Sequence, residues 1–344
     1  MEKKINVLCI DGGGIRGVIP GTILAHIESE IQKRTDKEAR LADYFDLIAG
    51  TSTGGILTCA YLLADEHGRP KLSAQQAVDI YLQEGGKIFD LSVKQKIKSL
   101  SGLTDEKFSA EALEKALKDK FGDALLSELL KPCLLTSYNV QERQATFFNS
   151  VNAKDNPDYD FKVVDIARAT SAAPTYFELA QIISNAGSKF PLIDGGVFAN
   201  NPSMCAYAEA RGLDFSEINK DPLKPNRPSG KNMFMVSIGT GSSEELFNPA
   251  KVKNWGMIEW VKPIIDIMMS GNTETVDYQL KALFGATDNE RSYFRIDPSI
   301  HKASSEMDDA SPKNLIHLKE AGLKYVEENS AQLDEIVTKL IQNK

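Results

Sequence analysis

Two strand–turn–helix units in the first 64 residues restrict this chain to an α/β fold. Ile5–Ile10 is an apolar run closed by Asp-Gly-Gly-Gly, and isoleucines then recur every fourth residue from Ile19 to Ile31. Phe45–Ala49 is a second apolar run, and a helical pattern follows over Thr53–Ala64. Short apolar runs that end in turn residues are typical of buried strands. The repeated order of strand, turn and helix predicts a parallel sheet with covering helices.

The remainder of the chain continues this alternation. We expect residues 65–130 to be mostly helical, and 218–231, with its prolines and basic residues, to form a solvated surface loop. Two amphipathic helices are expected after Pro312. Further strands are predicted at Cys133–Val140, Ala145–Asn149 and Met233–Ile238. Because no repeat or linker interrupts the 344 residues, one large domain and one domain with embellishments both fit.

The charge and the cysteines exclude several classes of protein. A net charge of −8 argues against a nucleic-acid partner and against a general attraction to anionic membranes, since both require clustered basic residues. The four cysteines are too scattered for a disulfide scaffold or a metal site, which favours a reducing compartment. The first apolar run is too short for a signal peptide, and Gly54–Ala64 is too short to span a bilayer. We therefore expect a cytoplasmic protein, with export by a signal-independent route left open.

A G-x-S-x-G pattern, Gly50-Thr51-Ser52-Thr53-Gly54, lies between a predicted strand and a predicted helix. A nucleophilic serine requires a sharp, strained turn that exposes its hydroxyl, and bulky neighbours would block such a turn. The pattern therefore favours Ser52 as a nucleophile, with Gly50, Thr51, Thr53 and Gly54 forming the elbow around it. A purely structural turn is the alternative.

A second glycine-rich turn, Asp11–Gly17, follows the first predicted strand. Its glycines allow backbone N–H groups to converge on an anion at the start of a helix. One reading is an oxyanion hole for acyl transfer. Another is a dinucleotide site, because Gly12, Gly14 and Gly17 fit G-x-G-x-x-G, but the acidic residue required at the end of the next strand is missing. A tight turn without a ligand is the third.

Candidate partners for Ser52 are an aspartate and two histidines. Asp194 follows an apolar run at Phe190–Ile193 and opens an Asp-Gly-Gly turn, which makes it a candidate general base. A triad in the chain order of α/β-hydrolases would add His301 or His317, although neither lies in a catalytic motif. No spacing of ligand residues fits a zinc or calcium site, so no metal is implied.

Six segments of the chain form a combination whose order and spacing coincidence does not explain. They are Asp11–Gly17, Leu41–Gly55, Ala169–Phe177, Asp194–Pro202, Ser237–Gly241 and Glu306–Ser311. Together they resemble the patatin-like phospholipase family, and the resemblance covers most of the chain. It implies a three-layer α/β/α fold with a mostly parallel central sheet, as a single domain over 1–344. The core motifs fall within 5–241, and about 255–344 is expected as a C-terminal helical extension.

The resemblance also implies a reaction and its residues. Members of this family hydrolyse lipid acyl esters with a Ser–Asp dyad, without histidine, calcium or a cofactor. Matched by motif, Ser52 becomes the nucleophile and Asp194 the general base. The oxyanion loop would consist of Gly12, Gly13, Gly14 and Arg16.

The implied substrate is a membrane or micellar lipid, either a phospholipid or a galactolipid, in a reaction of the phospholipase A or lysophospholipase type. Transient peripheral contact with a membrane would accompany it. The alternative is a storage or ligand-regulated effector protein with weak or conditional esterase activity. The intact Ser52, Asp194 and glycine turn argue against that alternative, because a storage role requires none of them.

An apolar segment, Trp255–Ser270, is the local candidate for contact with lipid. Six of its side chains would form an interfacial face: Trp255, Trp260, Ile264, Ile267, Met268 and Met269. Apolar residues at helical spacing more often pack into a core, and we favour that interpretation. Contact of the basic loop 218–231 with lipid head groups is the weaker alternative to solvation.

Overall fold

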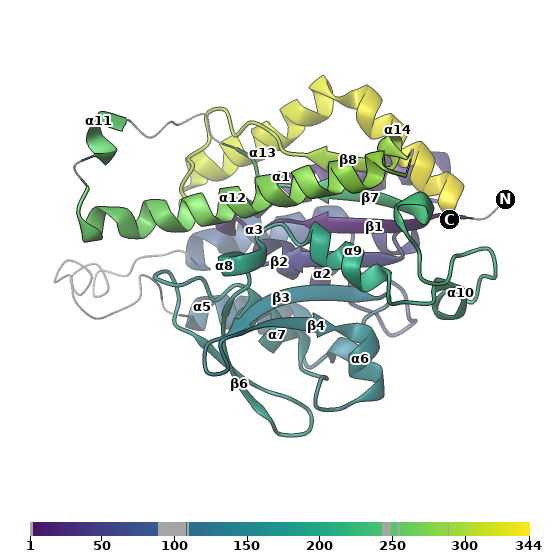
Figure 1. The fold of residues 1–344 in the computed structure, drawn as a ribbon, viewed down its shortest axis with the longest axis horizontal. Coiled ribbons are helices and arrows are strands. Elements are labelled where there is room, and N and C mark those ends of the chain that lie inside the picture. The colour runs from purple at the N-terminus through teal and green to yellow at the C-terminus, as the bar shows by residue number, and fades with distance from the viewer. Residues whose placement is uncertain (1–2, 89–107, 109, 243–248, 254, 288) are drawn as a thin grey trace.

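The computed structural model describes residues 3–88, 108, 110–242, 249–253, 255–287 and 289–344. These residues contain the strands β1 (Ile5–Ile10), β2 (Leu47–Thr51), β3 (Cys133–Asn139), β4 (Gln144–Asn149), β5 (Ala180–Ile183), β6 (Lys189–Asp194), β7 (Met233–Ile238) and β8 (Tyr293–Ile296). They form one sheet in the order β5-β6-β3-β2-β1-β7-β8, with β4 paired to β3 (Figure 1). The neighbours from β3 to β8 are parallel, and β4, β5 and β6 add antiparallel pairs. The prediction of a mostly parallel central sheet is confirmed.

Helices cover both faces of this sheet because its central strands are apolar on both sides. In β1, Leu8 and Ile10 pack into one core, whereas Ile5, Val7 and Cys9 pack into another. The first core is closed by α1 (Val18–Arg34), α2 (Thr53–Leu62), α3 (Ala74–Ile88), α5 (Glu111–Phe121), α6 (Ser150–Asp155), α7 (Val163–Thr170), α13 (Pro312–Glu328) and α14 (Ser330–Asn343). The second is closed by α9 (Ser203–Ala210), α10 (Phe215–Ile218) and α12 (Met257–Gly285). This is the predicted three-layer arrangement.

The remaining helices are α8 (Gly196–Ala199), α11 (Pro249–Val252) and the long α12. The 29 residues of α12 run across the front of the sheet in Figure 1 with α8 packed beside them, whereas α11 lies beyond the end of the sheet. Within the described parts of the chain, no helix is both long and apolar enough to cross a membrane.

Two boundaries differ from the sequence prediction for the second strand–turn–helix unit. The strand β2 spans Leu47–Thr51 rather than Phe45–Ala49, because the carboxylate of Asp46 accepts the Asn6 N–H that a strand neighbour would otherwise take. The helix α2 ends at Leu62 rather than Ala64, where the chain turns into an extended conformation and Ala64 bridges to Pro70. The shift places Gly50 and Thr51 inside the sheet.

The helices predicted in the rest of the chain are confirmed where the structure describes them, whereas two short strands were not predicted. The helices after Pro312 are confirmed, and α3 and α5 support the helical expectation for 65–130, of which 89–107 and 109 lie outside the described residues. The four-residue strands β5 and β8 were not predicted, because each is too short to show a pattern. Since β8 joins the central sheet, residues 255–344 are more than a helical extension.

The loop 218–231 is not uniformly solvated, because Lys224 is buried within it. Its Nζ donates to Asp46 Oδ2 at 2.7 Å and to the carbonyl oxygen of Lys4 at 3.0 Å. Asn219 Nδ2 donates to the other oxygen of Asp46 at 2.6 Å. The loop is therefore held at the N-terminal ends of β1 and β2 by a buried ion pair.

Replacing Lys224 alone should destabilise the protein, because it leaves a buried carboxylate without its cation. We expect Lys224→Met to lower the free energy of unfolding by about 3 kcal/mol, measured by urea denaturation at pH 7. Lys220→Met, which changes an exposed lysine of the same loop, should alter it by less than about 0.5 kcal/mol. Equal midpoints for the two variants would contradict this account of the loop.

Candidate active site

The turn that follows β2 holds Ser52 in a strained backbone conformation. Its φ is 55° and its ψ is −122°, a combination that residues other than glycine rarely adopt. A Cβ at Gly50 would overlap the carbonyl oxygen of Gly54, and one at Gly54 would overlap that of Ile10. The glycines therefore allow the turn to close tightly and to press against the end of β1.

Threonine side chains fasten this turn to its neighbours. The backbone N–H of Ser52 donates to Thr170 Oγ1 at 2.9 Å, and that hydroxyl donates to the Thr136 carbonyl at 2.6 Å. The Thr51 hydroxyl donates to the Ala199 carbonyl at 2.6 Å and lies 2.7 Å from that of Thr136. Sequence reasoning missed Thr136 and assigned no role to Thr170, although Thr170 lies in the segment Ala169–Phe177, because nothing local marks a threonine that supports another segment.

Thr53 lies on the other side of the turn, at the start of α2. Its hydroxyl donates to the Tyr81 hydroxyl at 2.8 Å, and that hydroxyl donates back to the Thr53 carbonyl at 2.9 Å. All five residues of the predicted elbow are therefore buried and in one compact turn.

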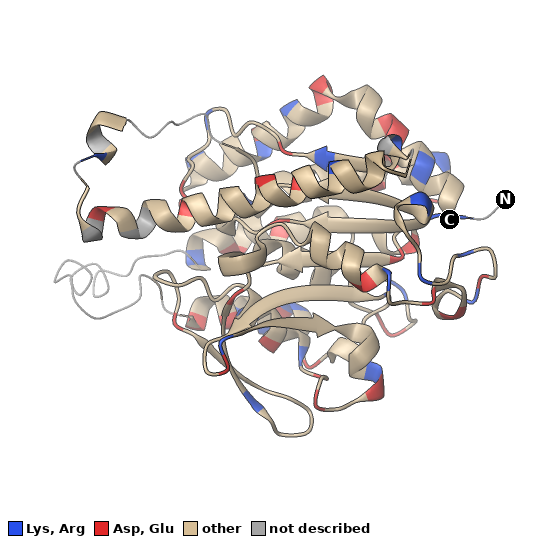
Figure 2. Ribbon diagram, viewed as in Figure 1, with Lys and Arg blue, Asp and Glu red and all other residues tan. Residues whose placement is uncertain are grey.

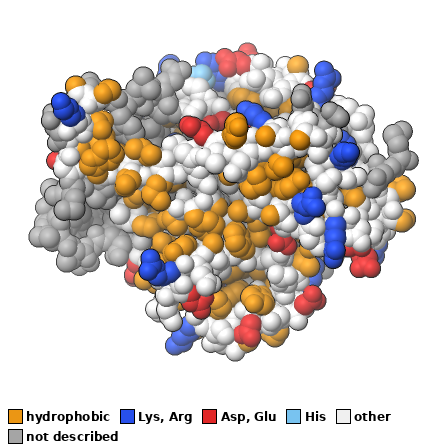
Figure 3. All heavy atoms as spheres, viewed as in Figure 1, with side chains coloured by type: hydrophobic (Ala, Val, Ile, Leu, Met, Phe, Trp, Pro, Cys, Tyr) orange, Lys and Arg blue, Asp and Glu red, His pale blue; other side chains and the backbone are white. Residues whose placement is uncertain are grey.

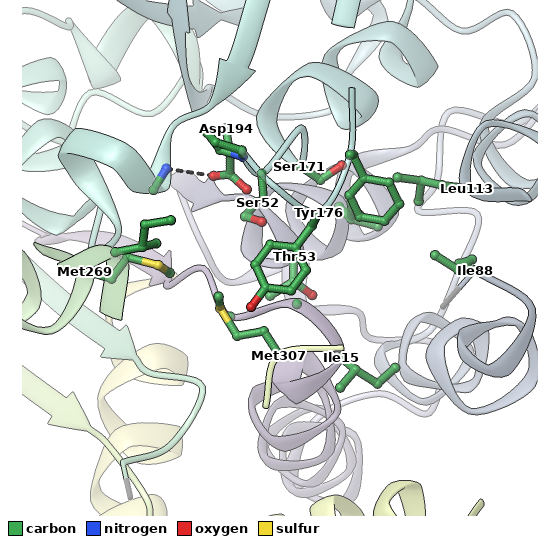
Figure 4. A pocket seen from close by; sticks show the side chains of 18 of the residues that line it. Ile15, Ser52, Thr53, Ile88, Leu113, Ser171, Tyr176, Asp194, Met269 and Met307 are labelled. Atoms are coloured by element: carbon green, nitrogen blue, oxygen red, sulfur yellow. Dashed lines mark hydrogen bonds between the residues drawn. The ribbon is translucent and has the colours of Figure 1, made fainter. Parts of the chain in front are cut away.

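Asp194, the last residue of β6, faces Ser52 (Figure 4). Burial raises the pKa of its carboxyl to about 6, and hydrogen bonds from the Ser52 hydroxyl and the Gly196 N–H act in the opposite direction. The Gly196 N–H donates to Asp194 Oδ1 at 2.7 Å, which fixes the carboxylate. At neutral pH this carboxylate is ionised, yet it holds a proton more readily than an exposed aspartate does.

The glycine turn after β1 borders the same site. The N–H of Gly12 donates to the Asn200 carbonyl at 3.1 Å, and the Thr240 hydroxyl donates to the Gly12 carbonyl at 2.9 Å. Gly13 and Gly14 line the cavity beside Ser52 and Asp194. For their N–H groups, no acceptor lies within hydrogen-bonding distance in the described part of the chain.

The structure places Arg16 away from the cavity wall. Its Nη1 donates to the Gly241 carbonyl at 3.4 Å, and burial lowers the pKa of the guanidinium. Of the predicted oxyanion loop, Gly13 and Gly14 therefore line the cavity, whereas the Gly12 N–H donates to the Asn200 carbonyl and the Arg16 side chain to the Gly241 carbonyl.

A buried ion pair anchors the base of the glycine turn. Arg295, from β8, donates to both carboxylate oxygens of Asp11 at 3.0 and 2.6 Å, and to the Ser237 hydroxyl at 2.9 Å. Burial raises the pKa of the Asp11 carboxyl to about 6, and the charge of Arg295 acts in the opposite direction. Because this pKa still lies below neutral pH, the pair is ionised there. Sequence reasoning missed Arg295 because its strand was not predicted.

The cavity next to Ser52 is almost entirely apolar. Apolar side chains from six parts of the chain that are far apart in sequence line its wall: Ile15, Ile56, Leu113, Phe177, Met268 with Met269, and Met307. None of the four histidines is among the lining residues. No group of three or more metal-binding side chains occurs among the described residues. The arrangement presents a hydroxyl and a carboxylate at one wall of a slot suited to a hydrocarbon chain.

The chain resembles known proteins over most of its length. Residues 8–207 match the family described as patatin-like phospholipase. Patatin-like protein 2 of Arabidopsis thaliana is 39% identical over 92% of this chain and 82% of its own, and Probable inactive patatin-3-Kuras 1 of Solanum tuberosum is 31% identical over 98% and 92%. Human GIVD cytosolic phospholipase A2, a solved structure, aligns at 11% identity and a TM-score of 0.43 over 99% of this chain and 60% of its own, too distant to add to the assignment. The identities and the matched region show that the chain belongs to the patatin-like phospholipase family.

Proposed function

We propose that this protein is a serine hydrolase that cleaves acyl ester bonds of lipids with Ser52 and Asp194. Membership of the family supports lipid acyl hydrolase activity, and the residues and mechanism are our inference. The observation that carries it is the strained Ser52 beside a buried carboxyl whose pKa is raised to about 6, at the wall of an apolar cavity. Strain of this kind persists where a function requires it.

In the proposed reaction, the Asp194 carboxylate takes the proton of the Ser52 hydroxyl as Oγ attacks the acyl carbonyl. The tetrahedral intermediate collapses, the bond to the alcohol breaks, and Asp194 returns the proton to the departing alkoxide. A water molecule then attacks the acyl-enzyme and gives its proton to Asp194. Release of the fatty acid returns that proton to Ser52.

The negative oxygen of the intermediate requires donors that are not already engaged. We assign this role to the N–H groups of Gly13 and Gly14, which line the cavity. The N–H groups of Gly12 and Ser52 are already engaged, because they donate to the Asn200 carbonyl and to the Thr170 hydroxyl, respectively. Each oxyanion donor is worth about 3–4 kcal/mol in measured cases.

The proposed substrate is a phospholipid or galactolipid, because the cavity suits an acyl chain and offers little to a polar head group. We propose that calcium is not required, since the aspartate and the two N–H groups supply the base and the oxyanion site. A storage or effector role remains the competing function, and one relative bears the name Probable inactive patatin-3-Kuras 1.

Removing the nucleophile should abolish hydrolysis. We expect Ser52→Ala to lower fatty-acid release from phosphatidylcholine vesicles in EDTA by about 10³-fold or more. His301→Ala and His317→Ala, measured separately, should remain within a few-fold of the unmodified protein. Release that survives in Ser52→Ala would move the nucleophile elsewhere, and a large loss in either histidine variant would favour a triad. Loss of release in EDTA that calcium restores would contradict calcium independence.

The activity should also depend on the charge of Asp194. Because only the ionised carboxylate accepts a proton, kcat/KM for a soluble short-chain ester should fall about tenfold per pH unit below about 6 and reach a plateau above about 7. A profile of kcat/KM against pH, recorded in overlapping buffers at constant ionic strength, measures this dependence. A midpoint near pH 4 would mean that the carboxyl behaves as an exposed one.

Asp194→Asn should lose activity yet gain stability at high pH. The folded-state pKa of about 6 lies above the ordinary value of 3.8, so the wild-type carboxyl adds stability below about pH 4 and loses that contribution as the pH rises through 6. We therefore compare the free energies of unfolding of the variant and the wild type by urea denaturation at both pH values. The variant-minus-wild-type difference should be about 1–3 kcal/mol larger at pH 8 than at pH 4. A difference of the opposite sign would refute the raised pKa.

A further inference from the structure

The N-terminal half of α12 presents an apolar surface to solvent. Trp260, Ile264, Ile267 and Met268 are between 36% and 51% exposed. At about 100° per residue they fall within an arc of about 100° on one side of the helix. We call these four residues the α12 surface. The expectation that this segment would pack into the core was wrong for them, because helical spacing shows which residues share a face but not what covers it.

The α12 surface continues into the cavity of the candidate active site. Ile265 and Met269, on the adjoining side of the helix, line the cavity, and so does the exposed Met268. Met269 lies close to the turn after Asp194, since a Cβ at Gly196 would stand 3.7 Å from its methyl carbon. In Figure 3 hydrophobic side chains form a band over α12 and the elements beside it. An apolar route therefore leads from the outside of the molecule to Ser52.

The charges near this surface argue against an anionic partner. In the sequence, this half of α12 carries one basic residue, Lys262, and two acidic residues, Glu259 and Asp266, and the structure describes the two acidic side chains (Figure 2). Both lie outside the arc of the α12 surface. The chain as a whole carries a net charge of −8. A partner with a negative surface would be repelled, whereas a neutral or zwitterionic one would not.

We propose that the α12 surface docks onto a neutral or zwitterionic lipid bilayer and delivers single lipid molecules to the cavity. The inference rests on the proposed function and deepens it. Tryptophan, isoleucine and methionine suit the boundary between head groups and acyl chains, and burying them there removes exposed apolar area from water. The same contact brings the acyl chains of the bilayer to the mouth of the cavity at Met268.

The test separates docking from catalysis by using a protein that cannot turn over. In the Ser52→Ala background, we expect Ile264→Ser with Ile267→Ser to lower co-sedimentation with phosphatidylcholine vesicles by about tenfold or more. The matched control is Ile316→Ser with Leu323→Ser, which changes two exposed apolar residues of α13, and it should bind like the parent. Adding phosphatidylserine to the vesicles should not increase binding.

With Ser52 present, the Ile264 and Ile267 double variant should hydrolyse a soluble short-chain ester at the unmodified rate but release less fatty acid from vesicles. Equal vesicle binding by the two double variants would overturn the proposal. So would a dimer in analytical ultracentrifugation that the α12 variant converts to a monomer without a change in vesicle binding, because the surface would then contact a second copy. Absence of ester hydrolysis in the unmodified protein would refute the proposed function, while the binding comparison would still decide the docking.

Discussion

Two successive residues of β3 bring the candidate nucleophile and the candidate base together. Thr136 pairs in register with Thr51, immediately before Ser52, and Ser137 pairs with Asp194. The same Thr136 also bonds to the hydroxyls of Thr51 and Thr170. Because sheet register is fixed by backbone hydrogen bonds and by burial on both faces, the two candidate side chains do not depend on a flexible loop for their separation.

The third component, the glycine turn, is held against this pair by close backbone approach. Gly54 lies against the end of β1 where no side chain fits, and Arg295 holds Asp11 by two hydrogen bonds. This arrangement lowers the stability of the fold, because the backbone of Ser52 is strained and the carboxylates of Asp11 and Asp194 are buried, which raises their pKa values. The rest of the sheet and its two cores must supply the compensating stability.

The sequence was sufficient for the local features of the site and insufficient for what supports them. Glycines around Ser52 and after β1 mark strained turns by themselves, so Ser52 and the turn could be found without a structure. Asp194 gained its role only beside a serine. Thr170 lay in a segment that carried the resemblance but had no role assigned to it, and Arg295 gave no local signal, because the importance of both arises from contacts across the sheet. The exposure of Ile264 and Ile267 was equally hidden, since periodicity describes one helix and burial depends on its neighbours.

Residues before and after position 207, where the family match ends inside α9, contribute different parts of the site. Residues 8–207 contain Ser52, Asp194 and the glycine turn, to which the proposed reaction is assigned. The later residues supply Arg295, which anchors that turn, and α12, which closes the cavity. Asn272 joins α12 to α8 and to the loop after α8: it donates to the Phe198 carbonyl at 2.9 Å and accepts from the Asn201 N–H at 3.1 Å. If α12 docks as proposed, changes confined to its exposed residues Ile264 and Ile267 should therefore alter which lipid surface is reached, while the side chains beside Ser52 stay in place.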